Sequence, residues 1–390
     1  MRVDEIKGHL VKDIIPFWKD LKDNEFGGFY GEMDFDLNLL KRADKGGILN
    51  SRILWFFSNA YLMLGGEDNL RAAKHAYDFL RTAFYDKENG GVFWSVSYDG
   101  RPSDDTKHTY NQAFAVYGLA SYYSASGDRE ALSLAYSLVD TIEAFCRDQN
   151  GYLEAFDRCF KPVSNEKLSE NGVMASRTMN TLLHMLEAYT ELYRVDKNNN
   201  IADRIRWMLD LFADKVYNPS KIRLEVFFDD EMNSILDLNS YGHDIEASWL
   251  IDRSLEILED PEYSAKISPI TKALASHIHS VAMDGNSLNN ECENGNVDTK
   301  KVWWVQAEAI LGFLNGYQKD PSRKDYIESV AKLWEFTKTY MIDRRKGSEW
   351  FFELEKDGSP IVTRGIVGPW KCPYHNGRMC FEVMKRIDLQ

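Results

Sequence analysis

Cysteine is scarce in this sequence, and its few copies form neither a metal site nor a disulfide framework. The cysteines are Cys146, Cys159, Cys292, Cys372 and Cys380, an odd number without any Cys-x-x-Cys spacing. Scattered thiols of this kind are typical of the reducing cytosol and argue against a zinc site built from thiolates. The first 18 residues carry charge in every turn and lack the apolar core of a signal peptide. The sequence therefore predicts a cytoplasmic protein.

Long apolar runs, a surplus of positive charge and glycine-rich phosphate loops are also missing. No stretch approaches the roughly 20 apolar residues of a membrane helix. With 47 Lys+Arg against 61 Asp+Glu the net charge is −14, and an acidic surface repels nucleic-acid backbones and anionic lipid. Neither a G-x-G-x-x-G nor a Walker-type motif occurs. We therefore expect a neutral substrate, no nucleic-acid or membrane partner, and no cofactor.

What the sequence does contain is a sixfold repeat. Stretches rich in glycine or aromatic residues recur at steps of 63, 61, 71, 63 and 62 residues. They begin at Gly27, Gly90, Gly151, Ile222, Gly285 and Gly347. A period this regular indicates a repeat architecture in which no unit buries its apolar face alone.

Helical patterns fill the sequence between these stretches. In residues 52–64 the apolar positions form a broad helical stripe, residues 181–193 repeat it, and residues 71–84 form a more amphipathic pattern. Each unit thus offers an inner helix, an outer helix and a hairpin. Six units predict an all-α fold, an (α/α)6 barrel of six inner and six outer helices with short β-hairpins at one end, built as a single catalytic domain over residues 1–390. The irregular stretch 160–172 is interpreted either as a lid over a site or as an ordinary surface excursion.

The repeat also predicts which side chains meet. One residue in each unit follows the start of its hairpin stretch by 18 to 29 positions: Arg52, Tyr110, Asn180, His243, Trp303 and His375. If the six units close into a ring, these residues lie together at one end of it.

Histidines near the starts of inner helices are the candidates for proton transfer, because imidazole titrates near neutral pH. They are His184, His243 and His375, from three different repeats. The remaining histidines are expected on polar or outer faces: His9, His75, His108, His277 and His279.

Two of the candidate histidines precede a glutamate by three residues, His184 before Glu187 and His243 before Glu246. This spacing puts each pair on one helix face. The glutamate either orients the imidazole, joins a metal site or forms an ordinary salt pair. We favour orientation and expect no metal, because helical metal sites normally read Glu-x-x-His and no further carboxylate motif completes a ligand set.

Arginine and aromatic residues indicate what the site binds. Arg52 opens an otherwise apolar helix, where its guanidinium could hold an oxyanion. Aromatic planes without an accompanying basic patch suit a neutral, ring-shaped ligand rich in hydroxyl groups, such as a sugar. The aromatic residues are Trp303, Trp304, Trp370, Tyr110 and Tyr374.

Several motifs carry a resemblance to a known family. They are SYGHDIEASWL (240–250), KVWWVQAEA (301–309), WKCPYHNGRMC (370–380), ILNSRILWFF (48–57), ENGVMASRTMNTLLHMLEAY (170–189) and DRRKGSEW (343–350). With these motifs the chain, from about residue 15 to about residue 387, resembles the N-acylglucosamine 2-epimerase family, most of all its cellobiose 2-epimerase branch. The resemblance implies a metal-independent isomerase that inverts carbon 2 of the reducing-end glucose in β-1,4-linked disaccharides. Cellobiose would become glucosyl-mannose, and lactose would become epilactose.

The resemblance also implies roles for individual residues. His243 and His375 would form the acid/base pair, with His184 and Arg52 near the reacting oxygens. The implied sugar contacts are Tyr110, Asn180, Glu246, Trp303, Trp304 and Trp370. We expect a monomer whose partner is the disaccharide substrate.

The chemistry of carbon-2 inversion suits these residues independently. The reaction needs an open-chain aldehyde, removal of the neighbouring proton, and return of a proton to the other face. Either two bases on opposite faces of a planar enediolate do this, or the intermediate rotates and one base does most of the work. Arg52 and His184 could stabilise the charge on the enediolate oxygen.

Three other functions remain open from the sequence. The first is an N-acylglucosamine 2-epimerase or a mannose-type aldose–ketose isomerase, which would use the same histidines. The second is an inverting glycoside hydrolase, which needs two carboxylates roughly 6.5–9.5 Å apart, such as Glu246 and Asp244, and leaves three histidines without a task. The third is a non-catalytic binding toroid, for which the acid/base set would be superfluous.

Overall fold

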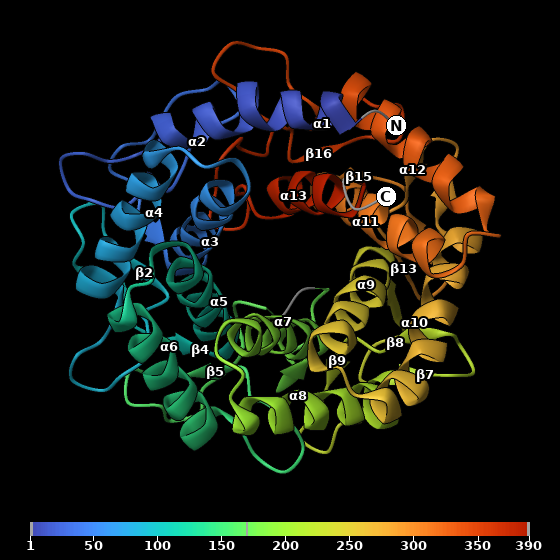
Figure 1. Cartoon of the computed structure of the whole chain (residues 1–390), viewed down its shortest axis with the longest axis horizontal. Helices are drawn as coiled ribbons and strands as arrows, with labels where there is room; N and C mark the ends of the chain where they lie inside the picture. The colour runs from blue at the N-terminus through green and yellow to red at the C-terminus, as the bar shows by residue number, and fades with distance from the viewer. Residues whose placement is uncertain (1–2, 169–170, 388–390) are drawn as a thin grey trace.

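Two concentric rings of helices make up the structure, a computed structural model that describes residues 3–168 and 171–387 (Figure 1). Consecutive inner helices pack against one another, and α13 packs against α3, so the inner ring is closed. The inner helices are α3 (Gly47–Leu64), α5 (Thr109–Ser126), α7 (Met179–Val195), α9 (Tyr241–Leu258), α11 (Trp303–Lys319) and α13 (His375–Ile387). The helix-rich fold predicted from the repeat is confirmed.

The outer helices surround this ring, each packed mainly on one inner helix, and most are continued by a π-helical turn. They are α1 (Val3–His9), continued by η1 (Leu10–Ile14) and α2 (Ile15–Asp20); α4 (Glu67–Phe79) with η2 (Leu80–Phe84); α6 (Arg129–Thr141) with η3 (Ile142–Cys146); α8 (Asn199–Leu211) with η4 (Phe212–Val216); α10 (Pro261–Val281); and α12 (Lys324–Phe336) with η5 (Thr337–Met341). The predicted helix over 71–84 corresponds to α4 and η2 together. None of the helices in the described ranges has both the length and the apolar character needed to cross a bilayer.

Burial explains why the two rings differ in sequence pattern. Inner helix α5 is packed against α3, α6 and α7, and its first 14 residues are all buried, so apolar or small side chains occur all around it. Outer helix α8 has one face towards solvent and buries Ile201, Ile205 and Leu209, which are four positions apart on the other face. The spacing of apolar residues along a helix therefore indicates whether the helix belongs to the inner or the outer ring.

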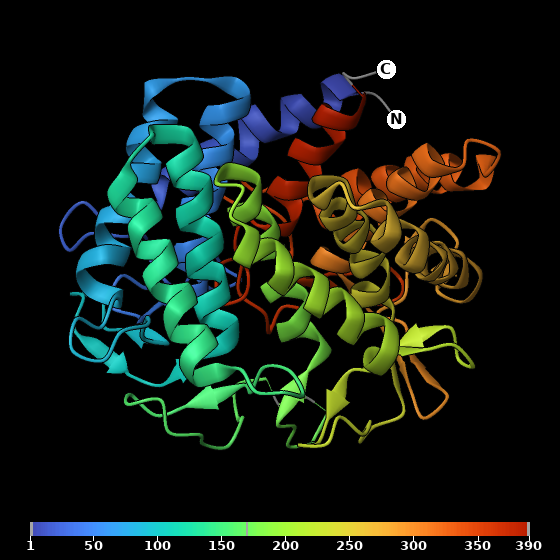
Figure 2. The same ribbon diagram turned by 60° about the horizontal axis from the view of Figure 1, so that its bottom comes forward.

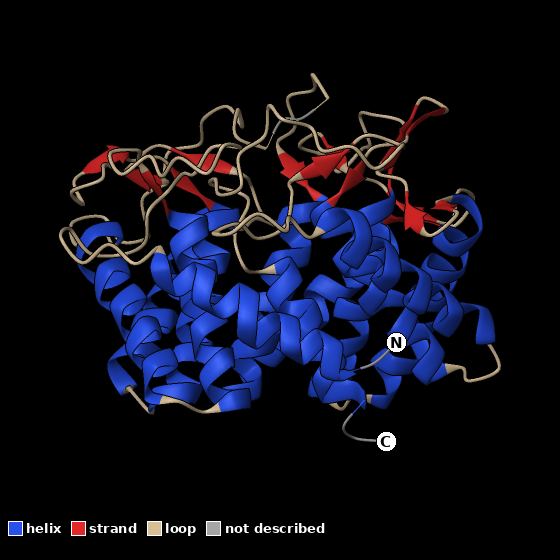
Figure 3. Cartoon of the chain, turned by 90° about the horizontal axis from the view of Figure 1, so that it is seen from above, coloured by secondary structure: helices blue, strands red, loops and turns tan. Residues whose placement is uncertain are grey.

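Short strands and long connections gather at one end of the rings, and α13 ends at the opposite end (Figures 2 and 3). One set of strand pairs joins neighbouring repeats: β1 (Lys45–Gly46) with β2 (Ser95–Val96), β4 (Lys107–His108) with β5 (Ala155–Phe156), β6 (Arg177–Thr178) with β9 (Phe227–Phe228), β10 (Leu238–Ser240) with β13 (Glu291–Glu293), and β15 (Lys301–Val302) with β16 (Glu353–Leu354). The other set forms hairpins: β2 with β3 (Pro102–Asp104), β7 (Tyr217–Asn218) with β8 (Arg223–Leu224), β11 (Met283–Asp284) with β12 (Ser287–Leu288), and β13 with β14 (Asn296–Asp298). The first set connects the starts of α3, α5, α7, α9 and α11 to the next repeat.

A buried lysine shortly before an inner helix fixes the same junction in several repeats. The Lys107 ammonium donates to Asp86 at 3.0 Å and to the carbonyl of Gly90 at 2.6 Å. Lys45 makes the equivalent bonds to Asp23 at 2.6 Å and to the carbonyl of Gly27 at 2.7 Å. Because both lysines are fully buried, these bonds hold each helix start firmly in place.

Inner helices α9 and α11 approach so closely that a glycine is required between them. A Cβ atom on Gly312 would lie 2.5 Å from Cγ1 of Ile245 and 2.8 Å from its carbonyl oxygen. We expect Gly312→Ala to lower the free energy of unfolding by about 1–3 kcal/mol, measured by chemical denaturation. The control is Gly8→Ala in helix α1, where a Cβ meets nothing within 4 Å, and where the exchange should stabilise by roughly 0.5–1 kcal/mol. Equal denaturation midpoints for Gly312→Ala and the unchanged protein would contradict this packing.

Candidate active site

The starts of the inner helices surround a cavity of about 450 Å³. Its lining includes all the residues to which the sequence assigned catalytic or sugar-binding roles: Arg52, Tyr110, Asn180, His184, His243, Glu246, Trp303, Trp304, Trp370 and His375. Tyr374, which was also named among the aromatic residues, lies behind the cavity wall and bonds to Glu187. The structure therefore brings the predicted residues together, while their individual roles stay predictions. Lining residues that sequence reasoning missed include Ser240, Asn290, Phe352 and Arg364.

His375, the first residue of α13, is held by a carboxylate from the neighbouring inner helix. Its Nδ1 lies 2.8 Å from Oε1 of Glu308, on α11, and Glu308 also accepts a 2.9 Å bond from the indole of Trp249. Because an ionised carboxylate only accepts hydrogen bonds, Glu308 favours the tautomer with hydrogen on Nδ1. The Nε2 atom of His375 is then free to take up a proton.

His184 and Glu187 form the pair that their spacing predicted. The Nδ1 atom of His184 lies 2.9 Å from Oε2 of Glu187. The hydroxyl of Tyr374 donates to the same oxygen, and Nη1 of Arg378 donates to the other oxygen at 2.5 Å. Glu187 is therefore saturated with donors, and it fixes the ring of His184 at the cavity wall.

The second predicted pair is wrong, because Glu246 does not contact His243. The Nδ1 atom of His243 is instead 2.7 Å from the hydroxyl of Ser240, which is the N-cap residue of α9 but makes no side-chain cap bond. Glu246 bonds to Nη2 of Arg378 and lies 3.9 Å from Nδ1 of His375. A buried guanidinium attracts a carboxylate more strongly than a neutral imidazole does, so Glu246 faces Arg378.

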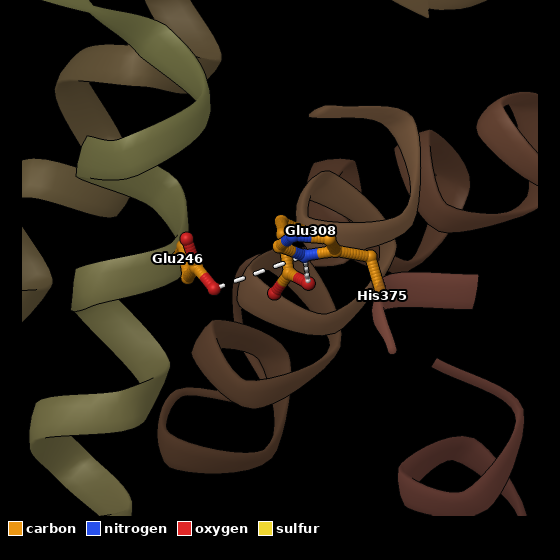
Figure 4. A group of neighbouring side chains, drawn as sticks. All are labelled: Glu246, Glu308 and His375. Atoms are coloured by element: carbon orange, nitrogen blue, oxygen red, sulfur yellow. Dashed lines mark hydrogen bonds and ion pairs between the residues drawn. The ribbon is translucent and has the colours of Figure 1, made fainter. Parts of the chain in front are cut away.

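Arg378 is the hub of a buried cluster of charges that the sequence did not reveal. It lies on α13 and donates to Glu187 on α7, Glu246 on α9 and Glu308 on α11, the last at 2.7 Å. Figure 4 shows Glu246, Glu308 and His375 converging, close enough together to hold a metal ion. The guanidinium of Arg378 already donates to oxygens of Glu246 and Glu308, so the cluster contains a cation of its own.

Arg52 is a buried cation that no carboxylate neutralises within the described chain. Nη2 donates to the hydroxyl of Tyr110 at 2.8 Å, and the guanidinium lies 4.1 Å from the ring centre of Phe114 and 4.5 Å from that of Tyr374. Its Nε atom is buried without a hydrogen-bond partner. An uncompensated charge at the cavity wall attracts an anionic oxygen.

Burial shifts the protonation of the site groups. Burial, and next the neighbouring His184, lower the pKa of His243 to about 3. Burial lowers the pKa of His375 too, with Arg378 adding to the effect. Both imidazoles are therefore neutral bases at neutral pH. Burial and the adjacent Glu308 raise the pKa of Glu246 to about 8, so this cluster keeps a proton that offsets part of its negative charge.

Two histidines expected on polar or outer faces are buried. His108 immediately precedes α5, where its Nε2 is 3.0 Å from Oδ1 of Asn165 and where burial lowers its pKa to about 4. His9 accepts a 2.8 Å bond from the indole of Trp350. In the stretch 160–172, positions 169 and 170 lie outside the described residues, and Leu168 lines the cavity. The described part of that stretch thus forms some of the cavity wall.

Comparison with known proteins places the chain among epimerases. The family model of N-acylglucosamine 2-epimerase matches residues 28–377. The cellobiose 2-epimerase of Ruminococcus albus is 50% identical over 390 residues, which cover 100% of both chains. A crystal structure of a sugar epimerase from a ruminal bacterium matches with a TM-score of 0.98 and 50% identity, covering 99% of both chains. The D-mannose isomerase of Marinomonas mediterranea is 24% identical over 98% of this chain and 97% of its own.

The chain is therefore an epimerase, as its motifs predicted. More particularly, it belongs to the N-acylglucosamine 2-epimerase family.

The charge cluster makes a prediction about stability. Arg378→Met removes the one cation shared by three buried glutamates, so we expect the free energy of unfolding at neutral pH to fall by about 3–5 kcal/mol. Without the guanidinium, burial raises the glutamate pKa values above those of the unfolded chain. A group whose pKa is raised in the folded state loses its contribution to stability as pH rises. The loss of unfolding free energy in Arg378→Met, relative to the unchanged protein, should therefore be larger at about pH 8 than at about pH 5.

A matched control is Arg101→Met, which breaks an exposed ion pair with Asp99 and should leave the unfolding curve unchanged. If Arg378→Met lowers the free energy of unfolding only slightly, and by the same amount at every pH, the cluster does not depend on this guanidinium.

Proposed function

We propose that the chain inverts carbon 2 of the reducing-end glucose in β-1,4-linked disaccharides, converting cellobiose into glucosyl-mannose and lactose into epilactose. The observation that carries the proposal is the meeting of three histidines from three inner helices around one cavity, beside an unneutralised arginine. The 50% identity to a cellobiose 2-epimerase supports the substrate class over that of the D-mannose isomerase, which is only 24% identical.

His243 and His375 are the proposed pair of bases. Both rings pack on the indole of Trp304, with ring centres 4.7 Å and 5.5 Å from it, so they face the same part of the cavity. One imidazole takes the proton from carbon 2 of the open-chain sugar. The electron pair of that bond becomes part of the double bond of an enediolate, and negative charge moves to the aldehyde oxygen. A proton returned to the opposite face by the other histidine completes the inversion.

Arg52 and His184 are proposed to stabilise the enediolate oxygen. Arg52 offers buried donors and an unpaired positive charge, and His184 is held in one orientation by Glu187. Preorganised donors of this kind need no rearrangement as charge develops, which lowers the barrier. Asn180, whose Oδ1 is buried without a partner, offers an acceptor for a sugar hydroxyl.

Aromatic side chains are proposed to hold the sugar rings. Trp370 and Tyr110 are 5.7 Å apart between ring centres, and Trp303 packs on Phe352 at 4.4 Å. The cavity of about 450 Å³ lies within the usual range of small-molecule sites, roughly 300–1,000 Å³, which supports a substrate of two rings. We further propose that the two rings of helices form the expected (α/α)6 barrel, acting as one monomeric catalytic domain in the cytoplasm.

Deuterium exchange at carbon 2 distinguishes the roles of the two proposed bases, His243 and His375. In cellobiose incubated in deuterated water and followed by NMR at carbon 2, we expect the unchanged protein to give labelled epimer. His375→Asn should block exchange from the gluco side, whereas His243→Asn should allow exchange without inversion. Trp303→Ala should mainly raise KM, because a stacking surface contributes on the order of 1 kcal/mol to binding.

The control is His277→Asn, on the outer helix α10, which should behave like the unchanged protein. If exchange persists in His375→Asn, the assignment of His375 to the gluco face is wrong, and the two histidines have exchanged roles or do not act as a pair. Full epimerase activity in both His243→Asn and His375→Asn would overturn the proposal, and release of free glucose would favour a hydrolase.

Activity should survive removal of divalent metals. Arg378 already bonds the carboxylates of Glu246 and Glu308, the residues that with His375 could otherwise hold an ion. We expect the rate with cellobiose to be the same before and after dialysis against a chelator. Loss of activity that one particular divalent ion restores would contradict this expectation.

A further inference from the structure

A second cavity, of about 250 Å³, lies towards the opposite end of the inner ring. Its walls come from the middle and C-terminal parts of inner helices, whereas the candidate active site lies at their starts. This is the end at which α13 finishes in Figure 2. The lining residues include Trp55, Tyr117, Arg194, Arg253, Glu382 and Lys385.

Two side chains separate this cavity from the candidate active site. Arg378 and Glu187 line the second cavity, and they bond to Glu246 and His184, which line the first. A molecule in the second cavity would therefore lie behind the charge cluster and would not compete with the sugar.

The hydroxyl of Tyr117 is an unused polar group in this second cavity. Tyr117 is only 6% exposed and stacks on Trp55, with 5.5 Å between ring centres. No described residue forms a hydrogen bond with its hydroxyl. This hydroxyl is therefore available to donate to a molecule bound in the cavity.

The charged walls also have more donors than acceptors. Arg194 donates to both oxygens of Glu191, at 2.9 Å and 2.8 Å, and Arg253 donates to Glu382 at 2.9 Å. The side chain of Lys385 is half exposed at the rim of the cavity, and its ammonium is 3.7 Å from Glu382, which is too far for a hydrogen bond. The two carboxylates are thus occupied, while a third cation keeps its donors free.

Cations outnumber carboxylates among the residues that line this cavity. The cations are Arg194, Arg253, Arg378 and Lys385, and the carboxylates are Glu187, Glu191 and Glu382. A ligand that fits must therefore bring negative charge and hydrogen-bond acceptors, and it needs no donors.

We propose that this cavity is a second ligand site, which binds a tetrahedral oxyanion, either inorganic phosphate or a phosphate ester. Phosphate oxygens accept the Tyr117 hydroxyl and the Lys385 ammonium, and Arg253 lies on the same wall to offset the charge. This ligand differs in charge from the neutral sugar proposed for the first cavity, so the two sites select different molecules.

The test is calorimetric titration of the full chain with inorganic phosphate, and separately with glucose 6-phosphate, at constant ionic strength. We expect one ligand per chain, bound equally well with and without saturating cellobiose. Tyr117→Phe and Lys385→Gln should each weaken binding by about tenfold, because each removes one hydrogen bond to a charged ligand. Tighter binding of glucose 6-phosphate would identify an ester as the ligand, and binding of phosphate alone would identify the free anion.

Two variants control for nonspecific effects. Tyr122→Phe removes a hydroxyl from the same helix away from the cavity, and Lys74→Gln removes an exposed charge from α4. Neither should change the affinity. The proposal is overturned if neither ligand binds, if Tyr117→Phe binds as well as Tyr122→Phe, or if cellobiose displaces the bound anion.

Discussion

The buried guanidinium of Arg378 is the contact on which both the inner ring and the candidate active site depend. Arg378 is 2% exposed and bonds carboxylates from three other inner helices. Neither the cation nor the carboxylates would be stable in this interior alone, and each compensates the other. Two of the carboxylates, Glu187 and Glu308, also hold His184 and His375. Closure of the ring and orientation of the imidazoles are thus parts of one network.

The partners of the two proposed bases differ in a way that suits a reversible proton transfer. Glu308 accepts from His375 and favours its protonated form once a proton arrives. The hydroxyl of Ser240 can either donate to His243 or accept from it, so this partner suits both the neutral and the charged ring. Ser240 gives up the usual capping bond of an N-cap serine to make this contact, which ties the start of α9 to the site.

The repeat period made much of the site predictable, because it superposes positions that are far apart in the chain. The inner-helix starts and the lining residues followed from that register, including Arg52 and Trp303. Arg378 and Glu308 were not predicted because they lie three and five residues after the first residues of α13 and α11, and only the closed ring brings them together. No local pattern marks such a contact.

Two wrong predictions have physical reasons of a different kind. The spacing of His243 and Glu246 shows only that they share a helix face, and it leaves open which charge each one meets. His108 was expected on a polar or outer face, although it stands directly before α5. The equivalent position before α9 is Ser240, which is also buried. Both residues are buried because each stands directly before an inner helix, at the end where the strands and connections cover the ring.

The parallel direction of the inner helices explains why the site lies at this end of the ring. Every inner helix except the last one, α13, is followed by an outer helix that returns the chain, so all inner helices begin at the same end. Helix N-termini carry partial positive charge, worth roughly half an elementary charge each, and its effect is strongest within the first turn. His375, Trp303 and Asn180 lie in such first turns. The proposed enediolate would therefore lie where the positive ends of several helices converge. Arg52 then adds a full charge at one point, and the fold itself favours an anionic intermediate.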